Sequence, residues 1–225
     1  MSPRATASVW LQAFTTLLAV CAVCAFGSTP VLGATQNDQT QFSVIAGSLS
    51  FSTVPGLPTL SGVTLNGQAQ TTTTQMSNFA VADATGSGSG WDVTVAGLTG
   101  AGNSAVFKQY CPTGGGCGTD PQGYVTAGAT LPANSLTLGS VGASFAAQNG
   151  STGTAPTLQC SSACNVDSAS VVKVASAALD AGMGTWLTSV FASNSLSLAT
   201  PSTLKVLSNG EVYRVNIVWT LNTGP

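Results

Sequence analysis

Carboxylates are the first side chains in this sequence that could carry out chemistry. Glycoside hydrolysis uses two of them, one on each side of the scissile bond. Asp83 and Asp92 flank a Gly/Ser-rich turn at residues 86–90, so a hairpin could bring them together. The plainer interpretation is that Asp83 begins the turn and Asp92 faces water. The other aspartates beyond residue 80 that could form such a pair are Asp120, Asp167 and Asp180.

The sequence lacks the residues that other catalytic arrangements need. The chain has no histidine, which excludes a histidine-based triad or metal site. The only glutamate, Glu211, follows the turn signal Asn209-Gly210. The glycines of residues 86–90 do not form a phosphate loop, because no lysine follows them and the next segment is strand-like. We therefore predict no catalytic residue, no cofactor and no resident metal.

Cysteines are the next reactive group. Beyond residue 34 the chain has four, Cys111, Cys117, Cys160 and Cys164. An even number in an exported chain indicates disulfides. Three pairings are possible, and we favour Cys111–Cys117 with Cys160–Cys164 because short loops close at the lowest entropic cost. The alternative is a four-cysteine zinc site.

Tryptophans are the candidates for sugar binding. Trp91 and Trp219 begin two similar tripeptides, Trp-Asp-Val and Trp-Thr-Leu. Each tripeptide lies in a stretch of alternating apolar and polar residues. One interpretation is that both rings fill a core between sheets. The other is that an indole face stacks on a pyranose ring, and the sequence leaves both open.

The elements that carry these residues are predicted from period-two alternation. Apolar residues at every second position predict strands over residues 91–95 and, most clearly, 213–221. Shorter strands are expected at residues 42–46, 49–53, 79–83, 136–138, 196–198 and 204–206, and the threonines at 71–74 suit a strand edge.

Three segments do not fit the alternating pattern. Residues 171–180 are rich in alanine and could form a helical turn or two. Residues 99–130 and 139–165 are expected to be long loops braced by the disulfides. The predicted fold is all-β, an antiparallel β-sandwich or barrel-like single domain.

The N-terminus predicts export. Arg4 precedes a nearly uncharged apolar stretch at residues 7–26, and small residues close the segment at Gly33-Ala34. This order is typical of a signal peptide. We predict a cleaved leader at residues 1–34 and an extracellular domain at 35–225; the alternative is a permanent membrane anchor.

Charge excludes several partners. The chain has five basic and seven acidic residues, and one of the five is Arg4. The four that remain form no basic patch, which argues against nucleic acid and, after cleavage of the leader, against a membrane surface.

Three stretches resemble the WxL family of Gram-positive cell-surface proteins, in its actinobacterial form. The first, residues 76–95, contains an Asp, a Gly-rich turn and Gly90-Trp91 in the family's order. The second is Gly182-Met183-Gly184, and the third is residues 213–221, followed by Gly224-Pro225. One departure is Val93, where the family's name motif has leucine.

The resemblance implies non-covalent attachment to the bacterial cell wall, with peptidoglycan as the expected glycan. The motif residues that would carry it, in binding or in structure, are Trp91, Val93, Tyr213, Trp219 and Leu221. A different class of function is a structural or adhesive subunit that binds other surface proteins. A carbohydrate-active enzyme is a distant third. The expected location is extracellular and wall-associated.

Overall fold

The computed structural model describes residues 39–207 and 210–225, which form fifteen strands and no helix. The predicted leader lies outside these residues. In the described part, no helix has the length and apolarity needed to cross a membrane. One compact unit, residues 45–225, holds all the strands. The all-β prediction is confirmed.

The strands form four antiparallel sheets, which we name A to D. Sheet A has the order β1 (Leu49–Thr53), β3 (Ala80–Asp83), β12 (Gly184–Thr188) and β8 (Phe145–Gln148). Sheet B has the order β10 (Cys164–Asn165), β7 (Leu136–Leu138), β13 (Leu196–Thr200) and β2 (Gln70–Thr74). Sheet C has the order β15 (Ile217–Thr223), β4 (Trp91–Gly97), β11 (Val172–Ala177) and β9 (Thr157–Leu158). Sheet D has the order β14 (Val212–Arg214), β5 (Lys108–Cys111) and β6 (Gly123–Tyr124).

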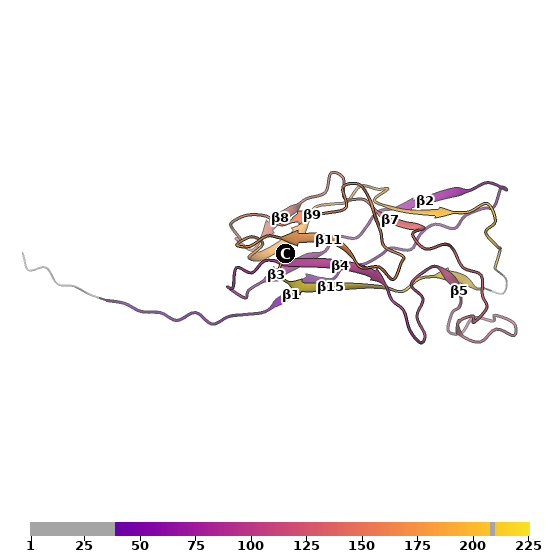
Figure 1. The fold of residues 1–225 in the computed structure, drawn as a ribbon, viewed down its shortest axis with the longest axis horizontal. Helices are drawn as coiled ribbons and strands as arrows, with labels where there is room; N and C mark the ends of the chain where they lie inside the picture. Colours follow the sequence, from indigo (N-terminus) through magenta and orange to yellow (C-terminus); the bar gives the residue numbers. More distant parts are fainter. Residues whose placement is uncertain (1–38, 208–209) are drawn as a thin grey trace, which may run out of the picture. The chain divides into compact units, whose positions relative to one another are not determined.

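The chain passes repeatedly between sheets A and B, and between C and D. Four consecutive pairs of strands, β1–β2, β2–β3, β7–β8 and β12–β13, connect A with B. Two pairs, β4–β5 and β14–β15, connect C with D. Sheets A and C form one half of the domain, the A/C half, and sheets B and D form the other, the B/D half. These connections join the two halves. Figure 1 shows β3, β4, β8 and β11 in one half and β2, β5 and β7 in the other.

The A/C half is a sandwich with a continuous core. Trp91, Val93 and Val95 alternate along β4 and are at most 1% exposed. The Trp91 ring meets Phe145 of β8 edge-to-face, with 5.9 Å between ring centroids. Phe79 also packs edge-to-face on Phe145, at 5.8 Å. Rings from both sheets thus fill the space between them, as period-two alternation predicts for a half-buried sheet.

Several predicted strands differ from the observed ones. Residues 171–180 are not helical, because they contain β11, in which Ala175 and Ala177 lie opposite Val93 and Trp91. The small side chains leave room for the indole, so packing overrides the helical propensity of alanine. Residues 42–46 and 204–206 form no strand. The two segments expected as loops contain five strands, β5, β6, β8, β9 and β10.

The strand predicted over residues 213–221 is divided in two. At Asn216 the backbone N–H donates to Ser104 and the carbonyl accepts from Leu98, so the chain leaves β5 and begins to pair with β4. The Asn216 side chain is also hydrogen-bonded to the Tyr124 hydroxyl. Alternation continues through the bend, which is why the sequence pattern does not reveal it.

Both disulfides lie in the B/D half. Cys111 at the end of β5 pairs with Cys117, and Cys160 pairs with Cys164 at the start of β10. The favoured pairing is confirmed, and the four-cysteine zinc site is wrong.

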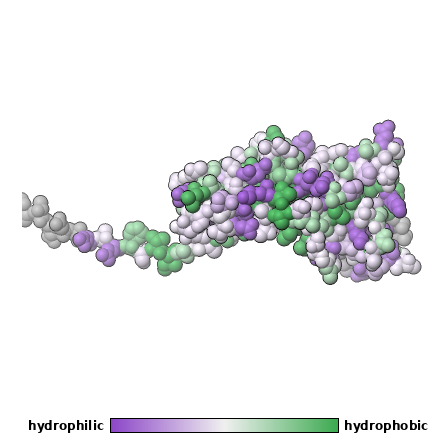
Figure 2. Space-filling model, in the orientation of Figure 1, coloured by the Kyte–Doolittle hydropathy of each residue, from purple (hydrophilic) through white to green (hydrophobic). Residues whose placement is uncertain are grey.

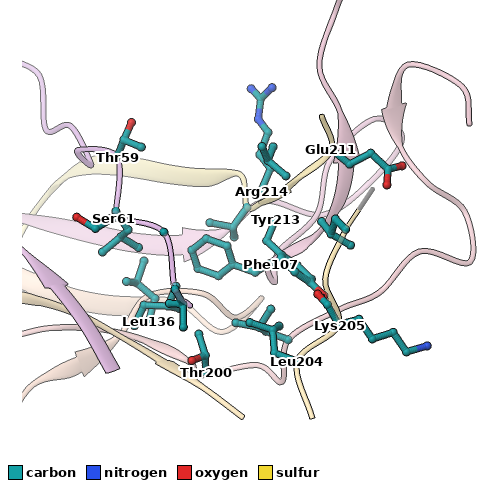
Figure 3. A pocket seen from close by; sticks show the side chains of 18 of the residues that line it. Thr59, Ser61, Phe107, Leu136, Thr200, Leu204, Lys205, Glu211, Tyr213 and Arg214 are labelled. Atoms are coloured by element: carbon teal, nitrogen blue, oxygen red, sulfur yellow. The ribbon is translucent and has the colours of Figure 1, made fainter. Parts of the chain in front are cut away.

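A groove of about 820 Å³ opens between sheets B and D. Its walls come from β7, β13 and β14, from residues 57–65 and from residues 204–207 (Figure 3). On the surface as a whole charge is scarce, and much of the face in Figure 2 has near-neutral hydropathy.

Candidate functional site

The two tryptophan motifs lie side by side on adjacent strands. In the antiparallel register of β4 and β15, Trp219 is opposite Val95 and Leu221 is opposite Val93. Directly opposed residues point to the same face of a sheet. Because Val93 and Val95 are buried, both motifs point into the sandwich. The motif residues therefore shape the core of the domain.

Trp91 is enclosed entirely. Its ring is 0% exposed and its indole N–H donates to the Gly182 carbonyl over 3.1 Å. The Trp91 ring therefore fills the core in this structure and presents no indole face at the surface. Val93, which replaces the family's leucine, is also 0% exposed and keeps the core apolar.

Two motif glycines are needed for this arrangement. A Cβ on Gly182 would lie 2.7 Å from the Trp91 indole nitrogen and 2.4 Å from the Ala177 side chain. A Cβ on Gly90 would lie 2.4 Å from the Ala177 carbonyl oxygen. Both glycines also have a positive φ, 72° and 71°, which side chains disfavour. The Gly90-Trp91 and Gly182-Met183-Gly184 motifs therefore form two parts of the pocket that holds the Trp91 indole.

Trp219 is less enclosed than Trp91. The centroid of its ring lies 6.3 Å from that of the Phe79 ring. Trp219 is half-buried beside a hollow of about 220 Å³, which it forms with Pro55 and Leu57. Tyr213 is half-buried too, and its hydroxyl donates to the Lys205 carbonyl over 2.9 Å. Leu221 is half-buried on the inner face.

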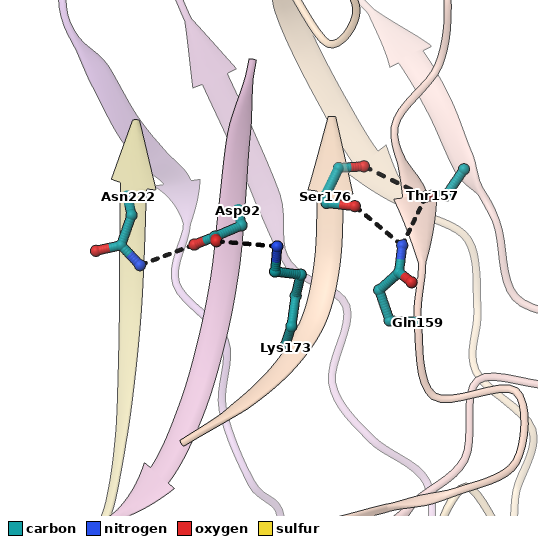
Figure 4. A network of polar contacts seen from close by, with 6 residues as sticks. All are labelled: Asp92, Thr157, Gln159, Lys173, Ser176 and Asn222. Carbon is teal, nitrogen blue, oxygen red and sulfur yellow. Dashed lines mark hydrogen bonds and ion pairs between the residues drawn. The ribbon is translucent and has the colours of Figure 1, made fainter. Parts of the chain in front are cut away.

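The outer face of sheet C carries a row of polar side chains. Asn222, Asp92, Ser176 and Thr157 occupy successive register positions on β15, β4, β11 and β9. At about 4.8 Å between strands, this row is about 14 Å long. We call these four residues, together with Lys173 and Gln159, the polar row; Figure 4 shows all six on one face.

Hydrogen bonds hold the polar row in place. The Asn222 amide donates to one oxygen of Asp92 over 2.8 Å, and the Lys173 ammonium lies 3.3 Å from the other. The Gln159 amide donates to the hydroxyls of Thr157 and Ser176 over 2.8 and 2.9 Å. The row thus has one acid and one base in contact, flanked by neutral amides and hydroxyls. The sequence pattern does not reveal the row, because each strand contributes only one or two of its members.

Asp83 and Asp92 belong to separate hydrogen-bond networks. Asp83 is buried and accepts hydrogen bonds from the backbone and hydroxyl of Thr85, over 3.0 and 2.7 Å. Asp92 belongs to the polar row. The turn interpretation of Asp83 therefore fits the structure.

A different carboxylate pair is present in the B/D half. Asp120 shares a hydrogen bond with Glu211, which raises the pKa of Asp120, and desolvation and repulsion by Glu211 add to the effect. Glu211 also accepts from the Gln109 amide over 2.8 Å. No sequence pattern connects Asp120 with Glu211, because they are 91 residues apart.

Asp167 has a structural role. It is 0% exposed, and its two oxygens accept the backbone N–H groups of Ser135 and Leu136 over 3.0 and 2.9 Å. Burial raises the pKa of this carboxyl, and the backbone hydrogen bonds oppose the rise. In residues 39–207 and 210–225, no three acidic, cysteine or histidine side chains are grouped closely enough to hold a metal ion.

Comparison with known proteins gives a family. No curated protein matches the chain, and no solved structure does. The family described as "WxL domain surface cell wall-binding" matches residues 36–225, which is most of the sequence. That description concerns wall binding at the cell surface rather than a reaction, and it places the protein outside the cell, in association with the wall. The chain belongs to the WxL family of surface proteins that bind the cell wall.

Proposed function

We propose that the protein attaches non-covalently to peptidoglycan, as a binding module without catalysis, through the polar row on the outer face of sheet C. The observation that carries this proposal is the row itself, in which amide, hydroxyl and carboxylate groups are aligned across four strands. Glycan hydroxyls both donate and accept hydrogen bonds, so a mixed row of donors and acceptors suits them.

The motif tryptophans support this function indirectly. Trp91 and Trp219 pack beneath the same sheet, while the opposite face remains available. Trp91 has no exposed surface, so it serves as a positioning residue for the outer face.

Charge supports a hydrogen-bonded mode of attachment. The one ion pair found in the described part of the chain, Lys173–Asp92, is nearly neutral as a unit. Attachment should therefore resist salt, which weakens contacts between exposed charges. We also propose that the leader at residues 1–34 is removed, so that the exported protein begins at Thr35.

A pull-down on purified, protein-free peptidoglycan tests the proposal. The double variant Asn222→Ala/Thr157→Ala removes both ends of the polar row, and Asn194→Ala/Thr126→Ala removes two exposed polar side chains elsewhere. With two hydrogen-bonding groups lost at about 0.5–1.5 kcal/mol each, we expect about tenfold weaker binding for the first variant. The second should bind as the unaltered protein does, and a high-salt wash should release neither.

Two results would contradict the proposal. If both double variants bind equally well, the polar row is not the contact surface. If the unaltered protein binds crude walls but not protein-free peptidoglycan, the partner is another surface protein, and the function is structural or adhesive.

A further inference from the structure

The groove between sheets B and D is lined mainly by leucine and valine side chains. Sheet B contributes Leu136, Leu196 and Leu198, and the opposite wall contributes Val215 and the Tyr213 ring. The irregular chain between β1 and β2 covers it in part with Leu57, Leu60 and Val63. Figure 3 shows these segments around the opening.

The size of the groove distinguishes it from a packing defect. Protein interiors are close-packed, with few voids larger than a water molecule. Side chains beside an empty space lose dispersion contacts on that side. A space of about 820 Å³ is instead within the range of small-molecule pockets, about 300–1,000 Å³.

The rim of the groove combines exposed apolar side chains with a cation. Val206 is 81% exposed and Val212 is 44% exposed, and both line the groove. Exposed apolar surface beside a groove is typical of a binding site. Lys205 lies beside Val206 among the lining residues, and in Figure 3 its side chain extends outward, away from the apolar side chains of the groove.

Lys205 and Arg214 both line the groove without an ion pair in the described part of the chain, and only Arg214 has a ring contact. Arg214 is stacked on the Tyr110 ring, with 4.4 Å from its guanidinium carbon to the ring centroid. Glu211 is held by Gln109. The Lys205 ammonium has no ion pair within the described residues, although its backbone carbonyl accepts from Tyr213. An anionic group at the mouth would therefore meet Lys205.

The lining favours a hydrocarbon chain over a sugar or a peptide. A sugar or a peptide backbone would bring many polar groups that need partners once buried. The hydroxyl groups of the lining are those of Thr59, Ser61, Thr200 and Tyr213. Thr200 donates to the Gln70 carbonyl and Tyr213 to the Lys205 carbonyl, so two of the four are already engaged. A methylene chain needs no such partners, and each buried CH₂ contributes about 0.8 kcal/mol.

From these observations we infer that the groove binds the acyl chain of a free fatty acid, with the carboxylate at Lys205. This ligand site is distinct from the polar row on sheet C. The exported protein would thus carry one face for glycan and one groove for lipid.

The test is equilibrium dialysis of the purified, delipidated protein against radiolabelled palmitate below its critical micelle concentration. We expect one palmitate per chain, bound saturably. Val63→Trp places an indole in the groove from the irregular segment and should weaken binding at least tenfold. Val141→Trp adds the same ring at a site 70% exposed and outside the groove, and it should bind palmitate normally.

A second comparison tests the headgroup contact. Lys205→Gln should weaken palmitate about two- to fivefold, the range expected for one exposed ion pair. The same variant should leave the binding of neutral hexadecanol unchanged. Equal effects on both ligands would show that Lys205 does not face the carboxylate.

Cross-linking provides a test that needs no variant. Palmitate with a terminal diazirine should label residues 57–65, 204–207 or 211–215 of the unaltered protein. Labelling elsewhere, absence of saturable binding, or normal binding by folded Val63→Trp would each overturn the inference. So would self-association that Val63→Trp abolishes while palmitate fails to bind, because the groove would then be an interface between two copies.

Discussion

The two halves of the domain are stabilised in different ways. In the A/C half, sheet C contains seven-residue strands, and Trp91, Val93 and Val95 are fully enclosed. In the B/D half no strand is longer than five residues, and the sheets leave a groove between them. Both disulfides are in this second half.

The contrast between the two halves indicates where disulfides contribute to stability. The A/C half encloses the inner face of its central strand β4 completely. The B/D half gives up part of its core to the groove, so its short strands have less packing to hold them. Cross-links that restrict the unfolded chain can compensate for that loss. A half built in this way can keep a cavity open without becoming disordered.

The largest expected effect is the loss of Trp91. Trp91→Ala leaves a cavity in the A/C core and removes the hydrogen bond to Gly182, so we expect about 3–5 kcal/mol of destabilisation in urea unfolding. Trp219→Ala should cost about 2 kcal/mol, because that ring is only half-buried. Equal costs would show that the A/C core extends around Trp219 as tightly as around Trp91.

Removing the disulfides tests the other half. Cys111→Ala/Cys117→Ala and Cys160→Ala/Cys164→Ala should each lower stability by about 2 kcal/mol, as expected for such short loops. Hydrogen exchange should become faster in β5, β7 and β10, while β4 remains protected. If β4 also exchanges faster, the two halves unfold as one unit and the contrast between them does not hold.

The sequence predicts strands with clear alternation better than very short strands. Alternation over residues 91–95 correctly indicates β4, because one face of this strand meets a core. The disulfides were predictable as well, since their loops are local. By contrast β6, β9 and β10 have two residues each, too few to show any period.

Long-range pairing limits what the sequence can predict about the site. The alternating pattern singles out Trp91 and Trp219, yet their inward direction depends on which strands are neighbours. The polar row unites Asn222, Asp92, Ser176 and Thr157 only through the register of four strands. Such a register is set by the whole sheet and leaves no local pattern.

Replacing the buried carboxylate Asp167 should destabilise the protein by a smaller amount, which depends on pH. Asp167→Asn replaces one acceptor by an amide donor that faces a backbone N–H of Ser135 or Leu136. We expect a loss of about 1–3 kcal/mol, the usual range for an unsatisfied buried group. Urea unfolding at neutral pH measures it, and an unchanged midpoint would show that β7 needs no such anchor.

The stability difference between the unaltered protein and Asp167→Asn should change with pH in a defined direction. Burial raises the pKa of Asp167 in the folded protein above its ordinary 3.8, so the folded state binds the proton more tightly than the unfolded state. This contribution to stability is complete below pH 3.8 and is lost as the pH rises through the folded-state pKa. The margin of the unaltered protein over Asp167→Asn should therefore shrink as the pH is raised through this window. A margin that grows would show that the backbone hydrogen bonds outweigh burial.

The smallest effect is expected on the outer surface of the A/C half. The Lys173 side chain is 41% exposed where it meets Asp92 at 3.3 Å, and exposed ion pairs contribute at most about 1 kcal/mol. A double-mutant cycle with Lys173→Gln and Asp92→Asn should give a coupling below that value, and it should decrease further in high salt because exposed charges are screened. A coupling that stays large in salt would mean that the polar row helps to hold sheet C together. In that case the A/C half would depend on its outer face as well as on its core, and the row could not be altered for binding studies without a change in stability. A small coupling leaves the row free to serve binding, because the tryptophan core alone then fixes the sheet on which it lies.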